Sequence, residues 1–213
     1  MTHTVFIRNI AGYVSFERGS MNIRDLLLQA RSYRRFREDR PVPSDLLIAA
    51  VDAARYAPAS ANAQVMRYAV CTARDMREKL FPHMAWAGKL KDWPGPAEGE
   101  RPTGYIVIGG DEQYPQFHMV DLGIASQSMF LFLSEAGYAA CMMGSINAKA
   151  IHEVVGFPDT VKVLQVLAVG YPGEKVVLDE MQAGGDTSYY RDANDVHHVP
   201  KRPLQEVLLR RFE

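Results

Sequence analysis

Cysteine is scarce in this chain of 213 residues, and Cys71 and Cys141 are the only two. Two cysteines so far apart in sequence do not make the disulfide framework of a small secreted protein, so both are expected to be buried side chains in a reducing, cytoplasmic environment. No apolar run approaches the ~20 residues that a membrane-spanning helix needs. The N-terminus lacks the basic, apolar and small-residue order of a signal peptide, so we expect a soluble protein.

An excess of charge of one sign is also missing. The 24 basic residues nearly balance the 25 acidic residues, and the formal net charge is -1. No general field therefore draws the protein to nucleic acid or to an anionic membrane surface. Any anion site must be local.

Several motifs of familiar enzymes do not occur. There is no Gly-x-Gly-x-x-Gly after a predicted strand, no phosphate-binding loop ending in Gly-Lys-Ser/Thr and no Gly-x-Ser-x-Gly elbow. These absences count against dinucleotide-binding folds, nucleotidases and serine hydrolases. Asp195, His197 and His198 are a weak candidate for a metal site, because adjacent histidines on an extended segment point to opposite sides and no third ligand is suitably spaced. We expect no metal.

Hydrophobic residues make up 47% of the chain, which is enough for one sizeable core, and we predict a single domain over residues 21–213. Residues 1–20 are of mixed character, and a much cleaner pattern starts directly after Met21. We therefore predict that Met21 is the natural start. Residues 1–20 are then an N-terminal extension, added for expression or by an over-called gene start.

Apolar spacing predicts helices and strands in alternation. Helices are predicted at residues 23–30, 46–54, 75–80, 119–138 and 147–155, and strands at 67–72, 105–108, 140–143 and 161–169. The pattern over residues 119–138 is apolar almost all round, so this helix is expected in the core or against another subunit. Residues 86–103 are long and irregular, which makes them a candidate lid. Interleaved strands and helices indicate an α+β or α/β sandwich.

Arginine gathers where the first predicted helix ends, in the sequence Arg-Ser-Tyr-Arg-Arg-Phe at residues 31–36. The planar guanidinium groups of Arg31 and Arg34 match the oxygens of phosphate or carboxylate. A second basic pair, Lys201 and Arg202, lies near the other end of the chain. The two clusters together predict one anionic ligand, and a phosphorylated cofactor is a natural choice. The alternative is that the arginines only occupy a helix C-terminus, where cations are favoured.

Residues 57–64, Ala-Pro-Ala-Ser-Ala-Asn-Ala-Gln, alternate small residues with hydroxyl and amide side chains. Such a loop is expected where the backbone approaches a ligand closely and a few polar groups orient it. An amide-bearing turn without a ligand is the alternative.

The order of these motifs resembles that of the FMN-dependent nitroreductase-like oxidoreductases over residues 21–209. Residues 31–36 are similar to the family's Arg-Ser-x-Arg-x-Phe, and residues 57–64 to its Ala-Pro-Ser-x-x-Asn-x-Gln. The sequence that starts at Asp121 resembles the beginning of the family's long central helix. Residues 142–145 resemble a turn that faces the flavin, and residues 201–204 resemble a C-terminal basic pair that closes on the phosphate.

The resemblance implies roles for individual residues. Arg31 and Ser32 are placed at the phosphate and ribityl end of FMN, and Arg34 is placed near the flavin pyrimidine edge, where it is the candidate catalytic residue. Ser60, Asn62 and Gln64 are expected to border the isoalloxazine. The full set of further cofactor-binding residues is Pro58, Ser60, Asn62, Gln64, Met143, Gly144, Ser145, Lys201 and Arg202.

The resemblance also implies a fold and a function. The fold is an α+β sandwich with a central, mostly antiparallel sheet flanked by helices, in a homodimer with each flavin at the interface. The function is reduction of a nitroaromatic, quinone or similar small molecule with NADH or NADPH, by a ping-pong hydride mechanism. Reductive dehalogenation, flavin breakdown and a non-catalytic redox sensor stay open as alternatives.

Overall fold

The computed structural model of the chain describes residues 2–9, 12–19, 22–90 and 92–213. The N-terminal strands Thr2–Asn9 (β1) and Gly12–Gly19 (β2) pair with each other in antiparallel register. Met21 lies outside the described residues. Its assignment as the natural start therefore stays a prediction.

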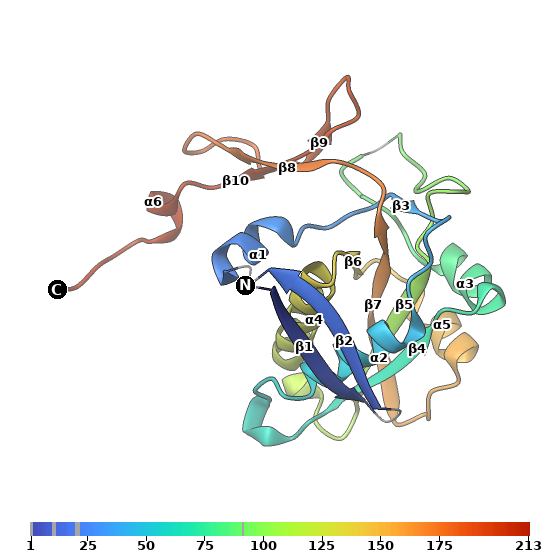
Figure 1. Cartoon of the computed structure of the whole chain (residues 1–213). Helices are drawn as coiled ribbons and strands as arrows, with labels where there is room; N and C mark the ends of the chain where they lie inside the picture. The colour runs from blue at the N-terminus through green and yellow to red at the C-terminus, as the bar shows by residue number, and fades with distance from the viewer. Residues whose placement is uncertain (1, 10–11, 20–21, 91) are drawn as a thin grey trace.

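A five-stranded sheet forms the centre of the protein (Figure 1). Its strands are Phe36–Arg37 (β3), Met66–Cys71 (β4), Gly104–Asp111 (β5), Ala139–Met143 (β6) and Val161–Pro172 (β7). The long strand β7 pairs with β5 on one edge and with β6 and β3 on the other, and β5 pairs in turn with β4. Every one of these pairings is antiparallel, so the predicted antiparallel sheet is confirmed.

Helices cover both faces of this sheet. They are Ser44–Ala54 (α2), Arg74–Leu80 (α3), His118–Glu135 (α4) and Ala148–Val155 (α5), and short 3₁₀ helices cover Ser60–Asn62, Phe81–His83 and Pro115–Phe117. Leu47 of α2 and Leu133 of α4 share one core with Ile106 of β5. Leu80 of α3 and Ile151 of α5 share a second core with the other face. The predicted sandwich is therefore confirmed, with one apolar core on each side of the sheet.

The helix predicted over residues 119–138 is α4. It buries Leu122, Ala125, Met129 and Leu133 at helical spacing, which places this stripe against the sheet. Its C-terminus is followed by Gly137, whose φ of 77° is a left-handed conformation that glycine adopts without steric cost. Apolar side chains near its N-terminus, including Met119, are exposed. The helix is thus central in the core and also presents an apolar surface.

The first predicted helix is Ile23–Gln29 (α1), and it begins as the sequence indicates. The side chain of Asn22 accepts a hydrogen bond from the backbone N–H of Asp25 at 3.0 Å. This bond satisfies one of the N–H groups that the first helical turn leaves without a partner. The helix ends at Gln29, Ala30 is its C-cap, and the arginine motif begins at Arg31.

A smaller sheet is built from the C-terminal part of the chain. Val176–Glu180 (β8), Tyr190–Arg191 (β9) and His197–Lys201 (β10) lie in the order β8-β10-β9. After β10, Leu204–Val207 (α6) and the C-terminus project away from the body (Figure 1). In the described part of the chain, no helix is long and apolar enough to cross a membrane.

The irregular segment of residues 86–103 packs against this smaller sheet. The Tyr189 hydroxyl accepts a hydrogen bond from the backbone N–H of Lys89 at 3.3 Å, and the Arg191 guanidinium lies 4.4 Å from the centre of the Trp93 ring. Of the described residues of this segment, 86–90 and 92–103, none lines either of the two cavities described below. Its interpretation as a lid stays a prediction.

Candidate active site

The structure brings Lys201 of the second basic cluster to the same cavity as Arg31 and Arg34 of the first. A cavity of about 250 Å³ opens between the end of α1, the middle of α4 and strand β10. Its lining residues are Ala30, Arg31, Ser32, Arg34, Gln127, Phe130, Met142, Tyr189, His197, Val199 and Lys201. We call this the anion cavity. Arg31, Ser32, Arg34 and Lys201, which the sequence placed around one ligand, all lie on its wall.

Three cations of this wall have no carboxylate partner among the described side chains, which are those of residues 22–90 and 92–213. None of these carboxylates lies within 4.0 Å of the charged groups of Arg31, Arg34 or Lys201. Nearby basic residues differ, since Arg35 pairs with Glu100 at 3.3 Å and Arg202 with Glu206 at 2.8 Å. A cavity lined by unneutralised cations favours an anionic ligand, because the ligand then supplies the missing counter-charge.

Arg31 also serves the end of helix α1. Its Nε donates to the Ala30 carbonyl at 2.6 Å and its Nη2 donates to the Leu27 carbonyl at 2.7 Å. These two bonds are the contacts that the alternative interpretation, a cation at a helix C-terminus, expects of Arg31. Burial lowers the pKa of the Arg31 guanidinium. The guanidinium has five N–H donors, so the two carbonyls leave donors for a ligand.

The backbone of the arginine motif is fixed by a buried glutamate. One carboxylate oxygen of Glu174 accepts hydrogen bonds from the backbone N–H groups of Arg34 and Arg35. The other oxygen accepts from Arg191 at 2.7 Å, and the Glu174 side chain is only 2% exposed. The charge of Glu174 is thus balanced by Arg191, and the side chain of Arg34 is left for the cavity.

His197 is a site residue that the sequence did not reveal. Its ring is fully buried, and its Nε2 lies 2.9 Å from Nη1 of Arg34. The neighbouring His198 points away from it and pairs with Asp179 at 2.9 Å, as expected for adjacent residues of a strand. The signal for it in the sequence was the His-His pair at residues 197 and 198. The position of Arg34 in the structure identifies His197 as the histidine of this pair that lines the cavity.

The buried imidazole gives a testable pH dependence of stability. Burial, and secondly the charge of Arg34, lower the pKa of His197 from 6.5 to about 4, although Glu174 acts in the opposite direction. Between these pH values the unfolded chain binds a proton that the folded chain does not, so stability falls as the pH falls from 6.5 to 4. The loss amounts to at most about 1.4 kcal/mol per pH unit.

His197→Gln removes this titrating group, so its free energy of unfolding should fall less steeply between pH 6.5 and 4 than that of the wild type. Urea unfolding of both proteins at several pH values measures the slopes. Equal slopes would show that His197 is not a buried, neutral imidazole in the folded protein.

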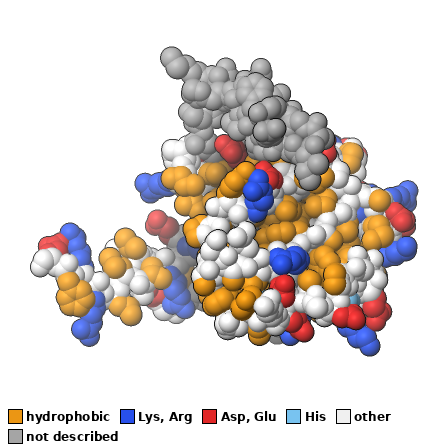
Figure 2. Space-filling view, turned by 90° about the horizontal axis from the view of Figure 1, so that it is seen from below, with side chains coloured by type: hydrophobic (Ala, Val, Ile, Leu, Met, Phe, Trp, Pro, Cys, Tyr) orange, Lys and Arg blue, Asp and Glu red, His pale blue; other side chains and the backbone are white. Residues whose placement is uncertain are grey.

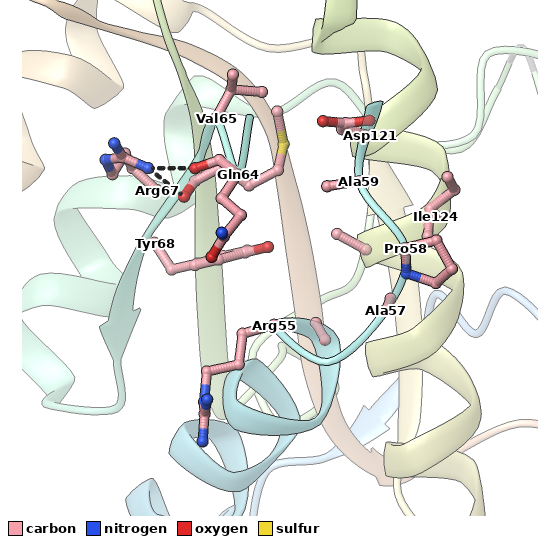
Figure 3. Close-up of a pocket in the computed structure, with 13 residues that line it drawn as sticks. Arg55, Ala57, Pro58, Ala59, Gln64, Val65, Arg67, Tyr68, Asp121 and Ile124 are labelled. Carbon is pink, nitrogen blue, oxygen red and sulfur yellow. Dashed lines mark hydrogen bonds between the residues drawn. The ribbon is translucent and has the colours of Figure 1, made fainter. Parts of the chain in front are cut away.

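The amide loop of residues 57–64 lies at a second cavity, of about 200 Å³ (Figure 3). We call it the loop cavity. Pro58 and Gln64 line it, together with Tyr68 of β4 and Asp121 of α4. Figure 3 shows the Tyr68 hydroxyl pointing toward the loop, while Arg67 points away and donates to the backbone carbonyls of Gln64 and Met66 at 2.8 and 3.0 Å. Burial raises the pKa of Tyr68 to about 12, so its hydroxyl stays protonated and can donate a hydrogen bond.

The loop has a strained backbone that one carboxylate holds in place. Ala61, Asn62 and Gln64 have φ values of 49°, 52° and 50°, a region that residues other than glycine rarely adopt. Asp121 fixes the start of the loop, because one of its oxygens accepts from both the backbone N–H and the hydroxyl of Ser60, at 2.8 and 2.7 Å. Strain of this kind, maintained by the surrounding structure, is typical of ligand-binding segments.

The remaining predicted residues line neither cavity. Met143 is buried at the end of β6, and Gly144 and Ser145 are exposed directly after it, where the Ser145 carbonyl accepts from Ala85 at 2.9 Å. Ser60 and Asn62 belong to the strained loop, and Arg202 is paired with Glu206. Within one copy of the chain, the amide loop and the anion cavity are therefore two separate sites.

An antiparallel sheet between two helical layers, with a cavity lined by Arg31, Arg34 and Lys201, defines an α/β sandwich protein with a cation-lined cavity. The family model described as "Nitroreductase family" matches residues 27–171, which is more than half of the chain. The chain belongs to the nitroreductase family, and the resemblance stated from the sequence is confirmed.

Individual relatives agree with this assignment. A protein of Methanothermobacter thermautotrophicus named "Putative NADH dehydrogenase/NAD(P)H nitroreductase" is 27% identical over 160 residues, which cover 72% of this chain and 79% of that protein. The crystal structure of a nitroreductase family protein from Clostridium difficile 630 superposes with a TM-score of 0.58 at 24% identity, over 72% of this chain and 86% of that one. An FMN and NADPH-dependent nitroreductase from sphigopyxis sp. strain HMH superposes with a TM-score of 0.57 at 17% identity, over 71% and 89%. At these identities the two structures show the shared fold.

Proposed function

We propose that this protein is an FMN-dependent oxidoreductase that uses NADH or NADPH to reduce a nitroaromatic, quinone or similar acceptor. The observation that carries the proposal is the anion cavity, where Arg31, Arg34 and Lys201 have no carboxylate partner among the side chains of residues 22–90 and 92–213. Membership of the nitroreductase family and the names of the relatives support the cofactor and the electron donor.

The residues of the cavity suit the two ends of FMN. Arg31, Ser32 and Lys201 would hold the phosphate and ribityl end, because a phosphate dianion needs several converging donors. Arg34 would lie beside the pyrimidine edge of the ring. When bound, FMN supplies the hydride-transfer chemistry, which explains why the chain needs no nucleophile paired with a base. The chain's own contribution is to bind, to orient and to place positive charge where negative charge develops.

We further propose that a second copy of the chain completes the site. Pro58, Ser60, Asn62 and Gln64 would then border the ring from the partner's loop cavity, and residues 143–145 and Arg202 would close the site around the flavin. Such sharing accounts for the separation of the loop from the anion cavity within one chain. Donor and acceptor would use the same exposed face of the ring in turn, which gives a ping-pong cycle.

We predict that the protein sediments as a dimer at micromolar concentration. Hydrophobic side chains gather on the projecting C-terminal segment and on the body (Figure 2). Exposed examples are Ile23 and Leu28 of α1, Met119 of α4, Leu209 and Phe212, the last being 87% exposed. Exposed apolar residues in such number are typical of a protein interface. Sedimentation velocity that finds only a monomer of 23.9 kDa would contradict the shared site.

Two assignments complete the proposal. The FMN-binding domain comprises residues 21–213, and residues 1–20 are an extension outside it. Cys71 and Cys141 are both free and buried, which suits a protein of the reducing cytoplasm.

The proposed function is tested by turnover with defined acceptors. Purified protein loaded with FMN should oxidise NADH or NADPH in the presence of a nitroaromatic or a quinone, with parallel double-reciprocal plots when both substrates are varied. Halide release from a halogenated aromatic, measured beside it, identifies reductive dehalogenation instead. Bound FMN that no pyridine nucleotide reduces would identify a sensor and would contradict the proposal.

A further inference from the structure

Two aromatic side chains from the C-terminal part of the chain hold the Arg34 guanidinium. Nη1 of Arg34 lies 2.9 Å from Nε2 of His197, and the guanidinium carbon lies 4.4 Å from the centre of the Tyr189 ring. The rings of Tyr189 and His197 are 5.4 Å apart, and all three side chains line the anion cavity. Nη1 of Arg34 also donates a longer hydrogen bond to the Ser32 carbonyl, at 3.5 Å. The position of the Arg34 guanidinium is thus set by one cation–π contact and two hydrogen bonds, of which the bond to His197 is the shorter.

The protonation state of His197 follows from this bond. A guanidinium has donors and no acceptor, so Nε2 of His197 must be the acceptor. An imidazole that accepts through Nε2 is neutral and carries its proton on Nδ1. Nδ1 is buried, and no partner for it occurs in the part of the chain that the structure describes. The lowered pKa of His197, about 4, agrees with a neutral ring at neutral pH.

A neutral acceptor has an advantage over a carboxylate at this position. A carboxylate would also orient the guanidinium, but it would cancel much of the positive charge at the cavity wall. The nearby Glu174 does not take this role, because its oxygens bind the backbone of Arg34 and the side chain of Arg191. The imidazole therefore orients Arg34 and leaves its charge uncompensated.

We propose that His197 is a positioning residue, whose neutral ring fixes the Arg34 guanidinium through Nε2 so that its full charge faces the flavin. The inference rests on the proposed function, in which Arg34 lies beside the pyrimidine edge. His197 acts through Arg34 and itself need touch neither the flavin nor the acceptor.

The first test is the midpoint potential of the FMN-loaded protein in single and double variants. His197→Leu removes the acceptor at similar volume, and its potential should fall in the same direction as that of Arg34→Met, by at least half as much. His197→Gln, whose amide oxygen can replace Nε2, should recover at least half of the loss. The double variant should match Arg34→Met alone, because both changes remove the same interaction.

His198→Leu is the matched control, since His198 contacts Asp179 and Asp192 and not Arg34. Its potential should equal that of the wild type. The proposal is overturned if His197→Leu binds FMN at the wild-type potential, or if its shift adds to that of Arg34→Met.

The second test does not depend on flavin. Nitrogen NMR of the full-length protein should show His197 with its proton on Nδ1. Arg34→Met should raise the pH at which His197 titrates, because one of the charges that disfavour its protonation is gone, while Glu174, Arg191 and His198 still face the ring. A proton on Nε2, or an unchanged titration, would refute the pairing even if His197→Leu fails to fold. Failure to bind FMN while NMR shows this pairing would count against the proposed function and leave the pairing established.

Discussion

Alanine at both Arg31 and Lys201 is expected to lower the affinity for FMN by at least a hundredfold. Both side chains line the anion cavity, and neither has a carboxylate partner among the side chains that the structure describes, in residues 22–90 and 92–213. A hydrogen bond to a charged group contributes ~1.5–3 kcal/mol, so two of them contribute about 3 kcal/mol or more. At ~1.4 kcal/mol for each factor of ten, this is two orders of magnitude in the dissociation constant. Titration of flavin-free protein at fixed salt concentration measures it.

Titration with riboflavin, which lacks the phosphate of FMN, separates the contribution of the phosphate to the affinity from that of the ring. The double variant should bind riboflavin about as well as the wild type does. The matched arginine control is Arg74→Ala, because Arg74 is 79% exposed and paired with Glu78 on the surface. Equal FMN affinity in the double variant and in the wild type would show that the anion cavity does not bind the phosphate of FMN.

Methionine at Arg34 is expected to lower the flavin midpoint potential while FMN occupancy stays close to that of the wild type. The phosphate has Arg31, Ser32 and Lys201, whereas the charge of Arg34 matters most when the ring becomes reduced. Only interactions that strengthen in the reduced or transition state accelerate the chemistry, so reduction by NADH or NADPH should also be slower. A shift of ~30 mV corresponds to about 1.4 kcal/mol for a two-electron couple, which is within reach of one partly buried charge.

A potentiometric titration of the wild type and of the Arg34→Met variant decides between three placements of the Arg34 side chain. A lowered potential at normal occupancy places its charge at the ring. Loss of FMN would make it a phosphate ligand instead. An unchanged potential with FMN bound would show that Arg34 does not act on the ring and is only a cation at a helix end.

The fold was predictable because its signals are local. Asn22 three residues before Asp25 marks the beginning of α1, and Gly137 marks the end of α4. The β-branched run from Val161 predicted the strand that became β7, although the strand extends to Pro172 and joins three neighbours. Which strands pair depends on contacts between distant parts of the chain, which periodicity does not encode.

The candidate site was predictable only in part. The two basic clusters were expected to bind one anionic ligand, and the structure places Arg31, Arg34 and Lys201 on one cavity wall but pairs Arg202 with Glu206. The shared ligand stays a prediction. The separation of the amide loop from that cavity was not predicted, since the order of motifs along a sequence does not give the distances between them in space. His197 was missed because its role depends on a contact with a residue 163 positions away.

The most direct test of the central claim is the visible spectrum of the purified protein, recorded with FMN and then under anaerobic conditions with NADH or NADPH. We expect a yellow protein that retains stoichiometric FMN after gel filtration and whose flavin bands bleach when the pyridine nucleotide is added. A colourless protein that takes up no FMN would contradict the account.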